Sequence, residues 1–274
     1  MRILIPWALS ALLLAGCSTL PSASERQAHA MALASSKGWL SSHIPAGDFD
    51  LVAYAPPSLT AGKPLTVYIE GDGFAWISGT QPSTDPTPRD PLALRLALAQ
   101  PAGHAVYLAR PCQYVNAAQS GCAQRYWTEA RFAPEVIHAM NLAIDDLKQR
   151  FNVTKLVLVG YSGGAAVAAL VAARRTDVAR LITVAGNLDH RAWTSYHRVR
   201  ALDVSLNAAD SATLSADLPQ THFLGGHDRV MPPALARKWP VAFTGLNASN
   251  LRIVEDADHA CCWADRWPAL LGMD

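Results

Sequence analysis

Apolar and polar positions divide the chain into two kinds of segment. Short, mainly apolar runs predict strands, at residues 49–54, 65–70, 105–109, 155–159, 181–185, 221–224 and 251–254. Longer segments with helical character lie between several of them, at residues 91–100, 134–147, 165–173 and 233–239. The central strands are continuously apolar, which is typical of a parallel sheet that helices cover on both faces. The pattern therefore predicts an α/β fold with a mostly parallel central sheet.

One folded unit accounts for most of this pattern. The chain has 274 residues, half of them hydrophobic, and shows neither an internal repeat nor a Gly/Ser linker that would split it. We expect one domain over residues 49–274, with residues 187–219 as a small cap insertion. The formal net charge is +1 and no Lys/Arg-rich run is present, so nothing points to a nucleic-acid partner.

The N-terminal residues form a separate signal. Arg2 precedes an uncharged, mostly apolar stretch that ends at Ala15, which is short for a transmembrane helix and typical of a secretory signal. Leu14-Ala15-Gly16-Cys17 resembles the lipobox of bacterial lipoproteins. The resemblance implies cleavage before Cys17 and attachment of diacylglycerol to its sulfur, which anchors the chain to a membrane.

The resemblance also implies a location. Residues 1–16 would be a signal peptide, and residues 17–48 a lipidated tether and N-terminal segment. Ser18 does not resemble the Asp that often retains such proteins at the inner membrane, so we expect the outer membrane of a bacterial envelope, facing the periplasm. An ordinary exported signal with an incidental cysteine is the alternative.

Four cysteines follow Cys17, and an even number in an oxidising compartment indicates disulfides. A bridge between Cys112 and Cys122 would close a small polar loop, and we favour it. Cys261 and Cys262 are neighbours, which leaves open a vicinal bridge or two buried thiols. Neither a Cys-x-x-Cys pair nor a His-Glu-x-x-His motif is present, so we expect no metal site.

The strongest candidate for chemistry is Gly160-Tyr161-Ser162-Gly163-Gly164. It lies between the strand at 155–159 and the helix at 165–173, the context in which Gly-x-Ser-x-Gly forms a nucleophile elbow. Glycines flank the serine because so sharp a turn leaves no room for a nearby Cβ. A glycine-rich turn that binds a phosphate, or nothing, is the alternative.

Two later residues complete a pattern with this serine. Asp228 follows the next-to-last predicted strand, and His259 follows the last one. With the elbow, they make the chain resemble the α/β-hydrolase fold family over roughly residues 49–270. The resemblance implies a catalytic triad in the family's chain order, Ser162, Asp228 and His259. Asp189 is the alternative acid, while Asp228 as a helix cap and His259 as a surface loop residue are the alternative roles.

The proposed chemistry needs each of these three types of side chain for a separate reason. A serine hydroxyl needs a base, an imidazole can take and return its proton, and a carboxylate fixes the tautomer of that imidazole. An oxyanion hole needs two N–H donors, for which we expect Gly163 and the backbone of Asp72, with Gly73 in reserve. Many family members have His where this chain has Glu70, which leaves the second donor open. The Asp72 carboxylate would have to face away from the oxyanion.

These expectations together describe a lipid-anchored serine hydrolase that acts on a small acyl substrate. We take a carboxylic ester as the default substrate, and we expect no cofactor. An acyltransferase or a peptidase would use the same groups. An envelope lipoprotein that keeps the fold only for binding is the rival from another class. The sequence does not indicate the oligomeric state. Aromatic residues that could line the pocket, at least half of which we expect in the core, are Phe74, Trp76, Tyr114, Trp127, Trp193 and Tyr196.

Overall fold

The computed structural model describes residues 20–272 except 61, 102–103, 118–119 and 212–216. The predicted signal peptide and Cys17 lie outside the described residues. Within them, an eight-stranded sheet has the order β1-β2-β4-β3-β5-β6-β7-β8. The strands are β1 (Leu40–Ala46), β2 (Phe49–Ala55), β3 (Leu65–Ile69), β4 (Ala105–Leu108), β5 (Leu156–Tyr161), β6 (Val178–Val184), β7 (Gln220–Gly225) and β8 (Leu251–Val254). Neighbours from β4 to β8 are parallel, whereas β2 is antiparallel to β1 and β4.

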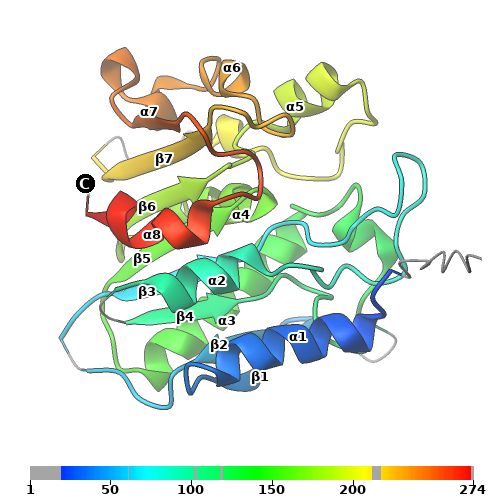
Figure 1. Cartoon of the computed structure of the whole chain (residues 1–274), viewed down its shortest axis with the longest axis vertical. Coiled ribbons are helices and arrows are strands. Elements are labelled where there is room, and N and C mark those ends of the chain that lie inside the picture. Colours follow the sequence, from blue (N-terminus) through cyan, green and yellow to red (C-terminus); the bar gives the residue numbers. More distant parts are fainter. Residues whose placement is uncertain (1–19, 61, 102–103, 118–119, 212–216, 273–274) are drawn as a thin grey trace, which may run out of the picture.

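Helices cover both faces of the sheet. On one face lie α1 (Ala23–Ser35), α2 (Leu92–Ala99) and α8 (Trp263–Leu271), and on the other α3 (Pro134–Arg150) and α4 (Gly163–Ala172) (Figure 1). Shorter helices lie in the later connections: η2 (Gln124–Trp127), α5 (His190–His197), η3 (Ala208–Asp210), α6 (Pro233–Ala236), α7 (Val241–Thr244) and η4 (Leu246–Ala248). This arrangement confirms the predicted α/β class.

Alternate residues of a strand enter two different cores. In β3, Val67 and Ile69 belong to the core that contains α3 and α4, whereas Tyr68 belongs to the core that contains α2 and α8. The hydroxyl of Tyr68 accepts a hydrogen bond from the indole nitrogen of Trp267 at 2.8 Å, so its polar atom is satisfied inside the core. Burial on both sides explains why the central strands read as continuous apolar runs.

The sequence pattern missed one strand. β1 carries Ser41, Ser42, His43 and Pro45, and its first residues are exposed at the edge of the sheet, so it lacks an apolar run. It nevertheless pairs with β2 over its whole length, from Leu40 to Ala46. The sheet therefore begins at residue 40, ahead of the boundary at residue 49 that we expected.

Parallel strands bring several loops to one edge of the sheet. The loops after β3, β5, β7 and β8 all follow the carboxyl ends of parallel strands, where sites in α/β proteins form. The predicted cap region contains α5 and η3, apart from residues 212–216, which lie outside the described residues. In the part of the chain that the structure describes, no helix has the length and apolar character needed to cross a membrane.

The Cys112–Cys122 disulfide is present, as predicted, in the loop after β4, with 5.6 Å between the two Cα atoms. Cys261 and Cys262, which we left open, are also bridged to each other.

Candidate active site

Ser162 occupies a sharp turn between β5 and α4. Its φ of +50° and ψ of −119° place a non-glycine residue at positive φ. A Cβ on Gly160 would lie 2.4 Å from the carbonyl oxygen of Gly164, and one on Gly164 would lie 2.4 Å from that of Glu70. Both glycines are therefore required by close backbone packing around the serine. This is the geometry that the Gly-x-Ser-x-Gly pattern predicts.

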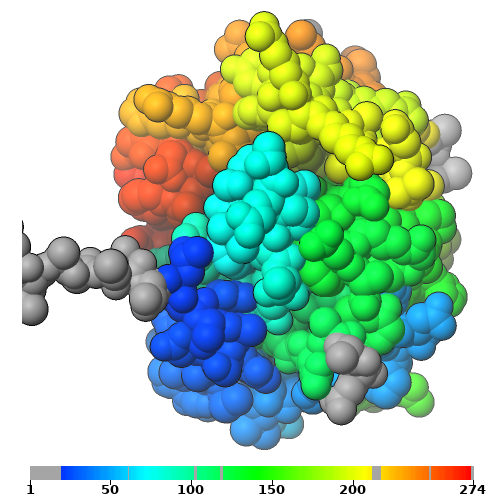
Figure 2. Space-filling model, turned by 90° about the vertical axis from the view of Figure 1, so that its right-hand side faces the viewer, coloured from blue at the N-terminus to red at the C-terminus, as the bar shows by residue number. Residues whose placement is uncertain are grey.

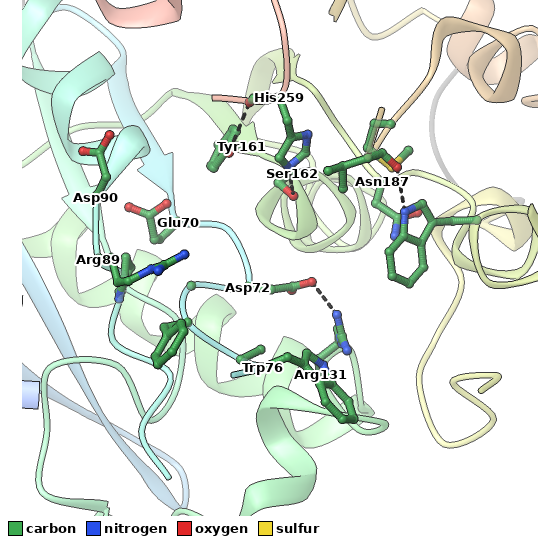
Figure 3. A pocket seen from close by; sticks show the side chains of 17 residues that line it. Glu70, Asp72, Trp76, Arg89, Asp90, Arg131, Tyr161, Ser162, Asn187 and His259 are labelled. Atoms are coloured by element: carbon green, nitrogen blue, oxygen red, sulfur yellow. Dashed lines mark hydrogen bonds and ion pairs between the residues drawn. The ribbon is translucent and has the colours of Figure 1, made fainter. Parts of the chain in front are cut away.

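Asp228 and His259 reach Ser162 from two other loops. Nε2 of His259 lies 3.0 Å from Oγ of Ser162, and Nδ1 of His259 lies 2.8 Å from Oδ2 of Asp228 (Figure 3 shows the serine and histidine). An ionised carboxylate only accepts hydrogen bonds, which assigns a proton to Nδ1 and leaves Nε2 free to accept one from the serine. The structure thus brings the three predicted side chains into one hydrogen-bonded chain.

The Asp228 side chain is fully buried and its other oxygen is also used. Oδ1 accepts from the backbone N–H groups of Val230 and Met231, both at 2.7 Å. These bonds lie in the loop before α6, whose N-cap is Pro232 and has no side-chain cap bond, so the helix-cap role that we considered as an alternative is not observed. These two backbone hydrogen bonds hold the carboxylate in place behind the imidazole.

Asp189 does not take part in this chain of contacts. Its Oδ1 accepts from the backbone N–H groups of Arg191 and Ala192 at 3.1 Å and caps the N-terminus of α5. Of the two candidate acids, only Asp228 contacts His259.

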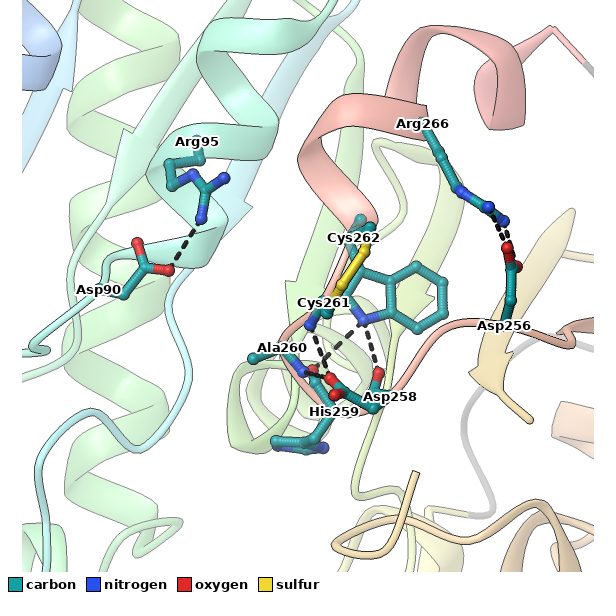
Figure 4. Close-up of a disulfide and its surroundings, with 10 residues drawn as sticks. Asp90, Arg95, Asp256, Asp258, His259, Ala260, Cys261, Cys262 and Arg266 are labelled. Atoms are coloured by element: carbon teal, nitrogen blue, oxygen red, sulfur yellow. Dashed lines mark hydrogen bonds and ion pairs between the residues drawn. A yellow bond between two sulfur atoms is a disulfide. The ribbon is translucent and has the colours of Figure 1, made fainter. Parts of the chain in front are cut away.

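The loop that carries His259 is braced at several points. The Tyr161 hydroxyl donates to the carbonyl oxygen of His259 at 3.2 Å, and the two rings lie 5.4 Å apart. Asp258 accepts from the backbone N–H of Cys261 at 2.7 Å, and the Cys261–Cys262 bridge lies directly beyond it (Figure 4). Trp263 donates to the carbonyl oxygen of Asp258 at 3.0 Å. These contacts orient the imidazole, and only the folded chain shows them.

Asp72 lies beside the elbow within a cluster of charges. A Cβ on Gly163 would lie 2.1 Å from Oδ1 of Asp72, so the carboxylate packs on the backbone of the residue after the serine. Arg110 and Arg131, both nearly buried, contact the carboxylate at 3.2 and 2.5 Å. Burial by itself would raise the pKa of Asp72, but the two guanidinium groups outweigh it and lower the pKa. The carboxylate is turned toward Arg131 (Figure 3).

Glu70 is a buried acid at the same edge. Its side chain is 1% exposed, and Oε1 accepts from the N–H of Gly71 at 2.8 Å. Burial raises the pKa of Glu70 to about 7, against an ordinary value of 4.5. The residue that stands where many family members have histidine is thus an acid with a pKa near neutral pH.

A cavity of about 420 Å³ opens above Ser162 and His259. Of the aromatic residues expected at this face, Phe74, Trp76 and Trp193 line it. Tyr114 and Trp127 are buried in the cores instead, and Tyr196 is exposed, so the expectation that at least half of the six residues lie in the core was wrong.

Sequence reasoning missed four polar residues of this wall: Arg89, Asp90, Arg131 and Asn187. No motif marks them, since they come from loops that the fold alone brings together. Among the described residues, no group of three or more His, Cys, Asp or Glu side chains is placed to hold a metal ion.

Comparison with known proteins gives structural matches only. No protein-family model matches the chain, and no curated protein matches it by sequence. An α/β serine hydrolase homologue from Coxiella burnetii superposes with a TM-score of 0.55 at 16% identity, covering 85% of this chain and 94% of its own. The Pyrococcus furiosus esterase Pf2001 gives 0.55 at 12% identity, covering 86% and 89%. An acylaminoacyl peptidase from Pyrococcus horikoshii gives 0.57 at 11% identity, covering 86% of this chain but only 41% of its own. The strand order, the elbow and these likenesses together show that the chain has the α/β-hydrolase fold.

Proposed function

We propose that this protein is a serine hydrolase that cleaves a carboxylic ester or a related acyl bond. The observation that carries the proposal is the continuous contact from Ser162 through His259 to Asp228, at 3.0 and 2.8 Å. The three residues come from separate loops of the sheet edge, so chance alignment of a serine with a histidine and a buried acid is a poor explanation.

The proposed reaction has two steps. Oγ of Ser162 attacks the acyl carbonyl while Nε2 of His259 takes the hydroxyl proton. The tetrahedral intermediate then collapses, the alcohol leaves with the proton from His259, and an acyl-serine remains. Water attacks this ester, His259 takes its proton, and the acid departs as Ser162 regains its hydrogen. Asp228 keeps the imidazole in the correct tautomer and stabilises its charged form throughout.

The proposed oxyanion hole uses the backbone N–H of Gly163 and that of Asp72. The neighbouring N–H groups are already engaged, since Gly71 donates to Glu70 and Phe74 donates to Pro86. Asp72 and its reserve, Gly73, therefore remain to supply the second donor. The pairing of the Asp72 carboxylate with two arginines neutralises a charge that would otherwise repel the oxyanion.

Among the structural neighbours, an esterase and a peptidase bear on the bond that is cleaved. We keep a carboxylic ester as the substrate class, with Trp76, Trp193 and Met231 as the apolar part of a wall that is otherwise largely polar. An acyltransferase would use the same acyl-serine with another acceptor in place of water.

A fluorophosphonate probe tests the proposal. We expect the wild-type protein to be labelled and Ser162→Ala to remain unlabelled, with p-nitrophenyl ester hydrolysis lost in parallel. Ser211→Ala, outside the cavity, serves as the matched control and should behave as wild type. If folded wild-type protein neither reacts with the probe nor hydrolyses any ester of a chain-length series, the non-catalytic binding role replaces this one.

We further propose that the mature protein is anchored through Cys17 in the bacterial outer membrane, facing the periplasm. The support is the Leu14-Ala15-Gly16-Cys17 segment and Ser18 after it. Labelled palmitate should enter the wild-type chain but not Cys17→Ser, and membrane fractionation should place the label in the outer membrane. Wild-type protein without incorporated lipid would contradict the anchor.

A further inference from the structure

A second cavity adjoins the one above Ser162. It has a volume of about 710 Å³, and Trp76, Arg131 and Trp193 line both cavities. Because the same three side chains border each, the two cavities lie side by side. Figure 2 shows the loop after β3, in cyan, next to the green segment around η2 and the yellow segment that follows α5. These are the segments that line the second cavity.

The wall of this second cavity is rich in positive charge. Arg131, Arg198 and Arg200 line it, and among the described residues Glu129 is the only carboxylate that does so. Arg131 is paired with Asp72, but neither Arg198 nor Arg200 forms an ion pair with a described residue. Both are exposed. Two arginines that lie two positions apart and form no ion pair with a described residue therefore line a space with one acid.

The acid offsets Arg200 only in part: the hydroxyl of Thr128 and, to a smaller extent, the charge of Arg200 lower the pKa of Glu129. Glu129 already accepts from the hydroxyl of Thr128 at 2.6 Å, and no ion pair joins it to Arg198 or Arg200 in the described structure. Arg198 ends α5 with a φ of +54°, a conformation that favours Gly or Asn at this position. A cation near a helix C-terminus complements the helix dipole, which accounts in part for Arg198 but not for Arg200 in the segment beyond it.

The two tryptophans that border both cavities form the apolar part of their shared wall. The indole nitrogen of Trp193 donates to the carbonyl oxygen of Val230 at 2.9 Å, which fixes the ring between the two cavities. Trp76 faces both cavities from the loop after β3. The two adjacent cavities together thus present Ser162 in the first, two indole rings that border both, and in the second two arginines without an ion pair to a described residue.

We propose that the second cavity is a subsite for an anionic group of the substrate, a carboxylate or a phosphate, which Arg198 and Arg200 bind. The scissile carbonyl lies at Ser162, and an apolar span between the two ends packs on Trp76 and Trp193. The position of the scissile bond rests on the proposed hydrolase function. Guanidinium groups suit this role because their fork of donors matches both carboxylate and phosphate oxygens.

Matched pairs of esters test the subsite. One pair is p-nitrophenyl octanoate and the p-nitrophenyl half-ester of suberic acid, which differ by a terminal carboxylate. Another is a monoacylglycerol and its phosphate ester, which differ by a phosphate on the alcohol side. A preference in the first pair places the anion on the acyl group, and one in the second pair places it on the alcohol.

The variant is Arg198→Gln with Arg200→Gln, and the control is Arg237→Gln with Arg252→Gln, two exposed arginines that line neither cavity. We expect the ratio of kcat/KM for the anionic ester to kcat/KM for its neutral partner to fall at least about tenfold in the variant, since tenfold corresponds to the loss of one charge-assisted contact and the variant removes two. The ratio should stay constant in the control, and the neutral ester should be cleaved at the wild-type rate by both.

Three results would overturn the subsite: a wild-type enzyme that does not prefer either anionic ester, a ratio unchanged in the variant, or an equal loss on charged and neutral esters. Binding separates this inference from the proposed function. Calorimetry with Ser162→Ala and the suberic half-amide of aniline should show binding that the two Arg→Gln changes weaken. If that holds while wild-type protein hydrolyses nothing, the subsite stands and the hydrolase function fails.

Discussion

Glu70→Gln is the most informative single perturbation of the site's surroundings. The Glu70 side chain is 1% exposed, and burial raises its pKa from 4.5 to about 7. In the unfolded chain the carboxyl regains its ordinary pKa, because water again surrounds it. Glutamine has a similar shape and stays neutral at every pH, so it removes the titration while keeping an acceptor for the N–H of Gly71.

The sign and size of the effect follow from proton linkage. Between pH 4.5 and 7 the folded state holds a proton on Glu70 that the unfolded state has lost, so stability falls as pH rises through this window. Below the window the carboxyl is protonated in both states, and above it ionised in both. This shift of the Glu70 pKa corresponds to about 3 kcal/mol of unfolding free energy. Wild type loses this stability as the pH rises through the window, whereas Glu70→Gln keeps it.

Urea unfolding at pH 4.5, 6 and 8.5 measures the effect. The difference in unfolding free energy between Glu70→Gln and wild type should grow by about 3 kcal/mol in favour of the variant from the lowest to the highest pH. Glu255→Gln, at an exposed glutamate, is the matched control and should follow wild type. Parallel pH curves for wild type and Glu70→Gln would refute the argument that Glu70 is buried without a compensating charge.

Three further predictions concern the site and its supports. Asp228→Asn should lower kcat for ester hydrolysis by about four orders of magnitude, because His259 loses the acceptor that sets its tautomer, whereas Asp189→Asn should leave kcat near wild type. Asp72→Asn should lower the unfolding free energy in urea by about 3–5 kcal/mol, since it leaves two nearly buried guanidinium groups without their carboxylate. Replacing Cys112 and Cys122 by Ser should lower it by about 3 kcal/mol, because the disulfide closes a loop of ten-residue separation.

Each of these has a clear contrary outcome. A larger loss of kcat in Asp189→Asn than in Asp228→Asn would move the acid to the loop after β6. An Asp72→Asn protein as stable as wild type would mean that water solvates the two arginines, so that they do not depend on the Asp72 carboxylate. Equal stability of the double serine variant and the oxidised wild type would show that the loop after β4 is ordered in the unfolded chain as well.

Local patterns in the sequence were enough for the architecture and for the candidate nucleophile. A buried strand is continuously apolar, a helix has its own period, and the elbow needs glycines within two residues of Ser162, so each signal lies within a short stretch of chain. The chain order then placed Asp228 and His259. β1 was missed for the same reason, since its polar edge residues carry no apolar pattern and its place depends on pairing with β2.

Tertiary structure alone decided what surrounds the serine. Arg110 and Arg131 reach Asp72 across 38 and 59 residues, and no spacing in the sequence marks such a contact. Among residues of one aromatic type, Trp127 is buried while Trp193 lines the cavity, because packing of whole loops and not residue type determines which faces water. The charge and shape of the site come from side chains that lie far apart in the sequence, and only the folded sheet brings those side chains together at one edge.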